Sequence, residues 1–187
     1  MFSILDSENY FKNDITVNDL YTAAITFSII LFVIGSSAVV LFPEKKKRAW
    51  IISLVNSFVT MVVGFLYLVH KVPKYPDFFS FGANTVEIFY DINNVSILIC
   101  LWFGLANIFD LLFGLIFYPQ QLGLLTAYVH HSVFIWIMII STTGNGFFIK
   151  ATPFASTFVF MLIEEFPTFL LALGSVFPAF RTGIINI

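Results

Sequence analysis

The sequence predicts an all-α integral membrane protein, built as a bundle of about five transmembrane helices. Hydrophobic residues make up 59% of the 187-residue chain and charged residues 11%, whereas a soluble domain usually carries about 25% charged residues. The apolar residues gather in five stretches of about 20 residues, the length that an α-helix needs to cross the hydrocarbon core. These stretches lack the alternation of apolar and polar residues that is typical of barrel strands.

The first two predicted spans lie on either side of a basic cluster. An acidic arm, residues 1–19, precedes the first span, residues 20–42, and its charge is the opposite of the basic lead-in of a cleavable signal peptide. The cluster at residues 44–48, EKKKR, ends this span, and the second span, residues 50–69, begins at Trp50. Because basic loops stay on the cytosolic side, we expect this cluster in the cytosol and the arm in the lumen.

Three further spans complete the predicted transmembrane domain, which extends over residues 20–180. We expect them at residues 95–118, 122–141 and 153–177. Counting spans from the basic cluster places the loops before the third and the fifth span in the lumen. The same count places a short tail, residues 181–187, in the cytosol.

Five ionisable side chains lie inside the last three predicted spans, where a charged side chain costs roughly 2.5–3.5 kcal/mol on insertion scales. They are Asp110, His130, His131, Glu164 and Glu165. Such residues usually face a bundle interior or a wet cavity, where they pair with one another. We therefore expect one polar pocket shared by three helices. Adjacent helical residues point about 100° apart, so the two histidines cannot both aim at one atom, and the sequence does not say which faces inward.

Two threonines extend the predicted pocket. Thr126 lies one helical turn before His130, and Thr168 shares a face with Glu164. Pro167 loosens the helix beside them, which frees backbone carbonyls that a cavity or a neighbouring helix must satisfy. The alternative is that these polar groups only join helices, at about 0.6 kcal/mol each.

Metal ions, cofactors and nucleic acids are not expected partners. Adjacent histidines on one helix chelate a metal poorly. The net charge of −2 gives no basic surface for a nucleic acid.

The residues by themselves are compatible with three functions. An imidazole accepts a proton near neutral pH, so a His–carboxylate pair in a dry pocket can activate a hydroxyl or an amine for attack on an acyl thioester. The same pair can instead anchor the polar head of a lipid. A chain of acids and histidines can also serve as a proton path in a transporter.

Two ordered motifs resemble the TLC-domain family of multi-pass membrane proteins, which includes translocon-associated proteins and the ceramide synthases. They are NIFDLLFGLIFYPQQLGLLTAYVHHSVF and, further along, MLIEEFPTFLLALGSVFP. Three features match the family in order. They are an aspartate in the helix that precedes the histidine helix, the histidine pair itself, and a later glutamate that is followed by proline and threonine. The resemblance covers about residues 100–180 and is closer to small TLC-domain proteins than to ceramide synthases.

The resemblance implies an endoplasmic reticulum membrane protein whose helices enclose a lipid-sized cavity, with membrane lipids as partners. In the ceramide synthase branch, two histidines are required for N-acylation by a fatty acyl-CoA. His130 and His131 are therefore candidate catalytic residues, with Asp110 and Glu164 or Glu165 as pocket partners. Other branches act in lipid sensing or trafficking. We expect a lipid-homeostasis protein that binds or senses a lipid, with an acyltransferase as the alternative and a proton-coupled transporter as the third hypothesis.

Two features depart from the family pattern. The ceramide synthase motif continues with a polar run, whereas neither histidine nor aspartate follows His131. The family usually has six or more helices. We therefore expect either a short or truncated form of the fold, or a homo-oligomer in which a second copy supplies the missing wall.

Overall fold

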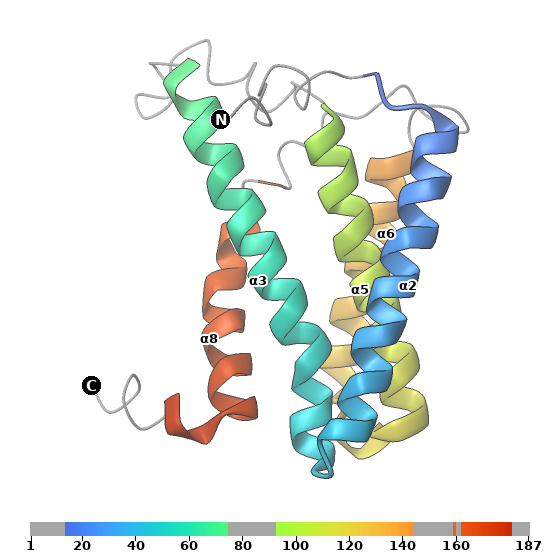
Figure 1. Cartoon of the computed structure of the whole chain (residues 1–187), viewed down its shortest axis with the longest axis vertical. Helices are drawn as coiled ribbons and strands as arrows, with labels where there is room; N and C mark the ends of the chain where they lie inside the picture. Colours follow the sequence, from blue (N-terminus) through green and yellow to red (C-terminus); the bar gives the residue numbers. More distant parts are fainter. Residues whose placement is uncertain (1–13, 75–92, 144–158, 160–161, 181–187) are drawn as a thin grey trace.

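The computed structural model describes residues 14–74, 93–143, 159 and 162–180, and these residues form helices without a strand (Figure 1). In this part of the chain, three helices are long and apolar enough to cross a membrane, and two shorter apolar helices accompany them. The predicted fold class is confirmed: the protein is an all-α helical membrane bundle.

Helix α2 (Val17–Leu41) forms an outer face of the bundle. It begins with a capping box, in which the Asp19 N–H donates to Thr16 Oγ1 at 3.2 Å and the Thr16 N–H donates to Asp19 Oδ2 at 2.9 Å. These bonds satisfy backbone donors that the first turn of a helix leaves free. Large apolar side chains such as Ile29 and Phe32 are exposed along α2, as expected for a helix that faces lipid.

Helices α3 (Lys45–Lys71) and α5 (Asn94–Phe117) form the centre of the bundle and contact each other and α2. The start of α5 is fixed by buried polar contacts. Ser96 N–H donates to Asn93 Oδ1 at 3.0 Å, and Asn93 Nδ2 donates to the Tyr67 hydroxyl of α3 at 2.9 Å. The hydrophobic core between the helices includes Leu31, Ile52, Tyr67, Phe103, Ala106 and Met138.

The predicted fourth span is not one regular helix. A 3₁₀ turn (Pro119–Gln121) leads into a π-helix (Leu124–Val129), and α6 (His130–Thr143) begins at the first histidine. In the π-helix, the Tyr128 N–H donates to the Gly123 carbonyl, five residues earlier, at 3.3 Å. Such wide turns inside helices are rare and occur frequently at functional sites.

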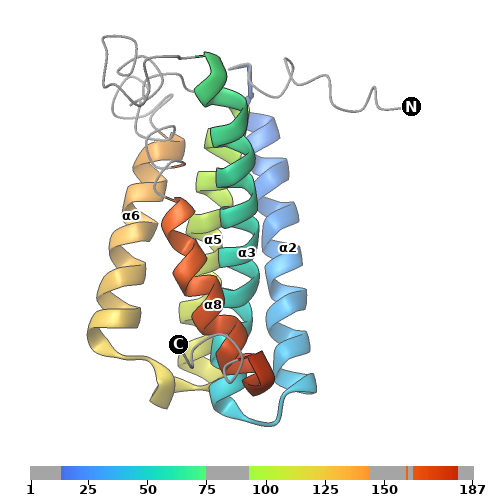
Figure 2. The ribbon, with the colours of Figure 1, turned by 90° about the vertical axis from the view of Figure 1, so that its left-hand side faces the viewer.

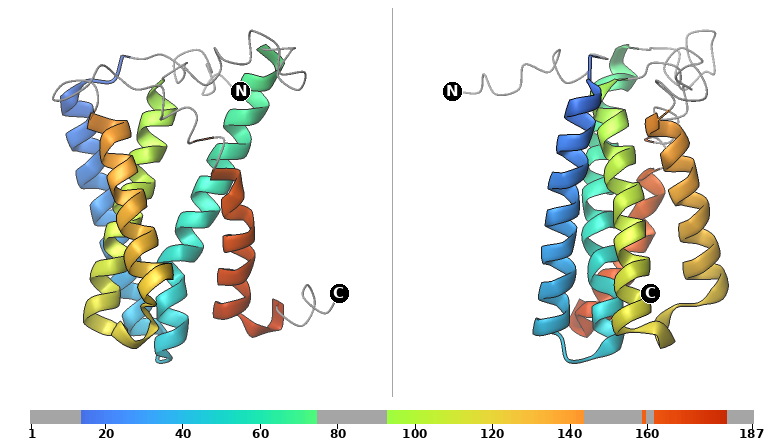
Figure 3. Two further views of the ribbon diagram at one scale, coloured as in Figure 1. Left: turned by 180° about the vertical axis from the view of Figure 1, so that it is seen from behind. Right: turned by 90° about the vertical axis from the view of Figure 1, so that its right-hand side faces the viewer.

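The last described helix, α8 (Glu165–Val176), follows a 3₁₀ turn (Leu162–Glu164). The predicted start of the fifth span, residue 153, lies outside the described residues, as do most of the N-terminal arm and the tail at 181–187. Helix α8 packs mainly on α3, and α6 packs mainly on α5 (Figures 2 and 3). The central helices α3 and α5 therefore position α8, which carries Glu165, and α6, which carries the two histidines.

Candidate functional site

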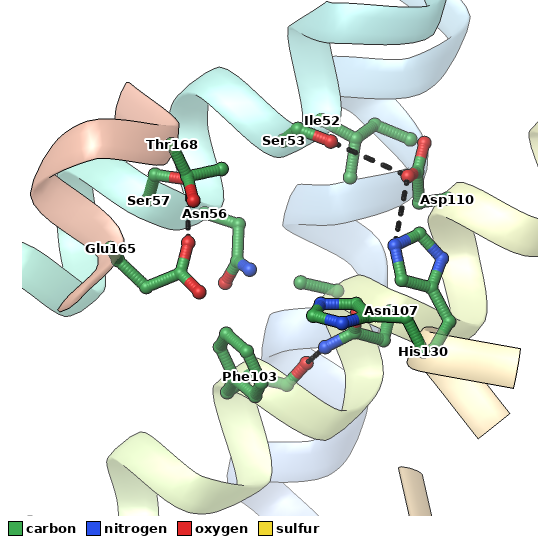
Figure 4. Close-up of a pocket in the computed structure, with 12 residues that line it drawn as sticks. Ile52, Ser53, Asn56, Ser57, Phe103, Asn107, Asp110, His130, Glu165 and Thr168 are labelled. Atoms are coloured by element: carbon green, nitrogen blue, oxygen red, sulfur yellow. Dashed lines mark hydrogen bonds and ion pairs between the residues drawn. The ribbon is translucent and has the colours of Figure 1, made fainter. Parts of the chain in front are cut away.

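A small polar cavity, which we call the inner chamber, lies among helices α3, α5, α6 and α8 (Figure 4). It contains about 50 Å³ of space that water-sized molecules can occupy, enough for roughly three to five waters. Helix α2 contributes no residue to its lining. The polar residues around the inner chamber are Ser53, Asn56, Ser57, Asn107, Asp110, His130, His131, Glu165 and Thr168.

A larger cavity adjoins the inner chamber and shares part of its lining. This second cavity, which we call the vestibule, contains about 390 Å³ of space. It shares five lining residues with the inner chamber: Ser53, Asp110, His130, His131 and Thr168. Its other lining residues include Lys46, Trp50, Tyr118 and Gln121. Lys46 belongs to the first turn of α3, so the vestibule extends toward the basic end of the bundle, residues 45–48. Ser53 lies seven residues further along α3, which corresponds to roughly 10 Å of helix.

Asp110 joins three parts of the fold in the wall of both cavities. Its side chain is buried, and it accepts hydrogen bonds from the Tyr118 hydroxyl at 3.1 Å and from Ser53 Oγ at 3.4 Å. His131 Nε2 lies 3.7 Å from Asp110 Oδ2, a distance suited to electrostatic attraction but too long for a direct hydrogen bond. The sequence analysis expected Asp110 and the histidines in one pocket without assigning pairs, and the structure places His131 next to Asp110.

One ring nitrogen of His131 has no hydrogen-bond partner among the described residues. The negative charge of an ionised Asp110 favours the tautomer with the proton on Nε2, and the neutral ring then has an acceptor at Nδ1. His131 Nδ1 is buried and has no hydrogen-bond partner in the described part of the chain. This arrangement resembles a carboxylate-oriented imidazole that is ready to accept a proton or a hydrogen bond from a ligand.

His130 occupies a different environment from its neighbour. It is exposed, and its ring packs edge-to-face on Phe134 with the ring centroids 4.6 Å apart. It also lines both the inner chamber and the vestibule. The two histidines thus take separate positions, as the 100° between adjacent helical residues requires.

Only one of the two predicted glutamates belongs to the site. Glu165 lines the inner chamber and accepts a hydrogen bond from Ser57 Oγ at 2.9 Å. Glu164 is exposed and does not line the inner chamber or the vestibule. Of the alternatives Glu164 and Glu165, the structure therefore places Glu165 in the lining, because the turn at the start of α8 points the two neighbouring side chains in different directions.

The two predicted threonines have different outcomes. Thr168, one turn after Glu165 on α8, lines both cavities. The side chain of Thr126 lies outside the described residues, so its predicted place in the pocket is not tested.

Helix α3 supplies pocket residues that the sequence analysis missed. Ser53, Asn56 and Ser57 line the inner chamber, and Thr60 continues the same face of the helix. Their spacing of i, i+3, i+4 and i+7 is that of one helical stripe. This polar stripe inside an apolar span could have predicted the four residues, but the sequence analysis considered only charged and titratable residues in the spans.

Unsatisfied polar atoms are concentrated at this site. Three buried side-chain atoms lack a hydrogen-bond partner in the described part of the chain: Asn56 Oδ1, His131 Nδ1 and Trp102 Nε1. The first two belong to residues that line the inner chamber. Leaving a buried polar atom unpaired costs about 1–3 kcal/mol. Among the described residues, no group of three or more His, Cys, Asp or Glu residues could hold a metal ion.

No family model, curated protein or solved structure matches this chain. The resemblance to the TLC-domain family therefore stays a prediction. Any function has to be argued from the inner chamber and the vestibule.

Proposed function

We propose that this protein binds or senses a membrane lipid in lipid homeostasis, with the lipid's polar head in the inner chamber. The observation that carries the proposal is the pair of buried acceptors, Asn56 Oδ1 and His131 Nδ1, which have no partner in the described part of the chain. A ligand that donates hydrogen bonds to these two atoms would satisfy both acceptors. Water alone would also do so, which is why the test below uses a lipid probe.

The sizes of the cavities limit how a lipid can bind. The inner chamber, at about 50 Å³, admits only a small polar group, while the vestibule, at about 390 Å³, has room for a larger segment. The inner chamber and the vestibule are each smaller than the lipid-sized cavity that the family resemblance implies. We infer that the ligand inserts its head and keeps most of its acyl chains among the surrounding lipids.

The membrane setting of this proposal follows from the sequence. We propose an endoplasmic reticulum location from the resemblance to the TLC-domain family, and a luminal N-terminus because the basic cluster at residues 45–48 favours the cytosol. In that orientation the vestibule extends toward the cytosolic leaflet, the leaflet from which a lipid head would enter.

Photocrosslinking in nanodiscs tests the proposal. The purified full-length chain is incubated with lipids that carry a photoreactive group near the head, and labelled peptides are identified by mass spectrometry. We expect labelling of α3 or α6 near the inner chamber and a clear loss of labelling in His131→Ala. Ser132→Ala, on the exposed next position of α6, is the matched control and should label like the wild type. Equal labelling of all three proteins, or labelling only on the outer face of α2, would refute lipid binding in the chamber.

A second candidate function is acyl transfer from a fatty acyl-CoA to a lipid hydroxyl or amine. One observation favours it: Asp110 faces one nitrogen of His131, and the other has no hydrogen-bond partner among the described residues, as in a carboxylate-oriented general base. Incubation with a labelled acyl-CoA and lipid acceptors should then yield an acylated product. His131→Ala and Asp110→Asn should lower the rate by about 10²-fold or more, the usual contribution of a general base. A protein that binds lipid but forms no product supports the binding function alone.

A further inference from the structure

The inner chamber has an imbalance of charge. It faces two carboxyl groups, Asp110 and Glu165, whereas neither lysine nor arginine lines it in the described part of the chain. Lys46 lines the vestibule but not the inner chamber. Apart from the two histidines, the lining offers no group that can become positive. Carboxylates inside a membrane bundle are costly unless a positive charge or several donors compensate them.

The two carboxyl groups have similar surroundings. Asp110 is surrounded by the Tyr118 hydroxyl, Ser53 and His131. Glu165 lies across the chamber from Asp110 (Figure 4); it accepts a bond from Ser57 at 2.9 Å and interacts with Thr168 and His130. Neither carboxyl group has a lysine or an arginine in the lining of the inner chamber.

Asn56 presents a second oxygen on the Glu165 side of the chamber. Its side chain is only 7% exposed, and Oδ1 has no hydrogen-bond partner among the described residues. In Figure 4 the Asn56 amide and the Glu165 carboxyl group, from α3 and α8, point into the same space. Two acceptor oxygens that face one small cavity repel each other unless a cation or a strong donor lies between them.

We propose that the inner chamber binds a compact monovalent cation, with Glu165 supplying the compensating charge and Asn56 a neutral oxygen ligand. Carboxylate and carbonyl oxygens suit hard cations, and an ammonium group offers three donors to the same acceptors. Space for roughly three to five water-sized groups accommodates a partly hydrated alkali ion or a primary ammonium head. The ammonium source rests on the proposed lipid binding, whereas the free ion does not.

Thermal unfolding of the full-length chain in detergent micelles tests the cation site. Sodium chloride, potassium chloride and the bulky tetraethylammonium chloride are compared at constant ionic strength. In a second series, a long-chain primary amine is compared with the alcohol of the same chain length. We expect a saturable rise of the unfolding midpoint with sodium, potassium or the amine, and none with tetraethylammonium or the alcohol.

Two substitutions make the result specific. Glu165→Gln keeps the shape and removes the charge, and we expect it to raise the half-saturating concentration by roughly ten- to a hundredfold, the value of a charged hydrogen bond. Glu164→Gln is the same change on the exposed neighbour and should behave like the wild type. Asn56→Asp adds a third carboxyl group to the chamber, beside Glu165, and should lower the half-saturating concentration, which keeps the test decisive even if Glu165→Gln does not fold.

The outcomes distinguish a free ion from a lipid-borne ammonium group, and the cation site from the proposed lipid binding. Stabilisation by the amine alone identifies a lipid-borne ammonium head, and stabilisation by sodium or potassium identifies a free ion. An alcohol that stabilises as well as the amine, with no effect of Glu165→Gln, overturns the cation site but leaves lipid binding intact. Stabilisation by acidification alone, through protons on Asp110, Glu165, His130 or His131, also overturns it. If neither ions nor amphiphiles have an effect, both proposals fail.

Discussion

The close approach of α5 and α6 allows a quantitative test of the packing that positions the histidines. Gly104 of α5 is buried, and a Cβ added there would lie 2.8 Å from Met138 Cβ of α6. Met138 Cβ is bonded directly to the backbone and cannot swing away. To reach the 3.4 Å of an ordinary contact, the helices must separate by at least 0.6 Å. We expect this overpacking to cost about 1–3 kcal/mol.

Gly104→Ala also gains helix propensity, so a matched control is required. Replacing glycine by alanine inside a helix contributes about 1 kcal/mol of stability. Gly114→Ala, in the same helix, receives the same gain. Its new Cβ would lie 2.6 Å from Leu122 Cδ2, but that atom ends a flexible side chain and can rotate away. The difference between the two variants therefore isolates the cost of separating α5 from α6.

Equilibrium unfolding in mixed detergent and SDS micelles measures this difference. We expect Gly104→Ala to be about 1–3 kcal/mol less stable than Gly114→Ala. Because α6 carries His131, only Gly104→Ala should also weaken photocrosslinking of lipid at the inner chamber. Equal stabilities, or a less stable Gly114→Ala, would refute the inferred packing of α6 on α5.

Three further predictions concern the polar contacts of the bundle. Asp110→Ala removes contacts with two neighbouring helices and a tyrosine hydroxyl, and should cost about 1–3 kcal/mol in the same unfolding assay; an unchanged stability would show that these contacts do not form. Asn93→Ala and Thr16→Ala each remove an N-cap worth about 0.5–2 kcal/mol. The first should be the more damaging because Asn93 is fully buried and also bonds to α3, and the reverse order would contradict this. Asn94 begins the triplet Asn-Val-Ser, but its Nδ2 donates to Asp14 Oδ1 at 2.6 Å, so we expect Asn94→Gln to leave electrophoretic mobility unchanged; a glycosidase-sensitive band in the wild type would argue against that contact.

Several properties of the site followed from single segments of the sequence. Apolar stretches of membrane-spanning length predicted a helical membrane bundle, because backbone groups in lipid must be satisfied within a helix or a closed barrel. The cost of ionisable groups in such stretches predicted that Asp110 and the histidines share a polar interior. The structure brings Asp110, His130, His131 and Glu165 to the lining of one inner chamber.

Other features depended on contacts between helices. The periodicity of a helix fixes the angle between two of its own residues but not the rotation of that helix against its neighbours. The polar stripe of α3 shows this limit, since its spacing is visible in the sequence while its direction depends on α5 and α8. The choice of Glu165 over Glu164, and of His131 as the partner of Asp110, has the same origin.

Composition and the length of the apolar segments were enough to predict a helical bundle in a membrane, because they decide which solvent a helix faces. Which polar side chains meet depends on the packing between helices, because the wide π-turn before His130 and close contacts such as Gly104 with Met138 set the rotation of each helix. A rotation of one residue position, about 100°, replaces the side chain that faces the chamber.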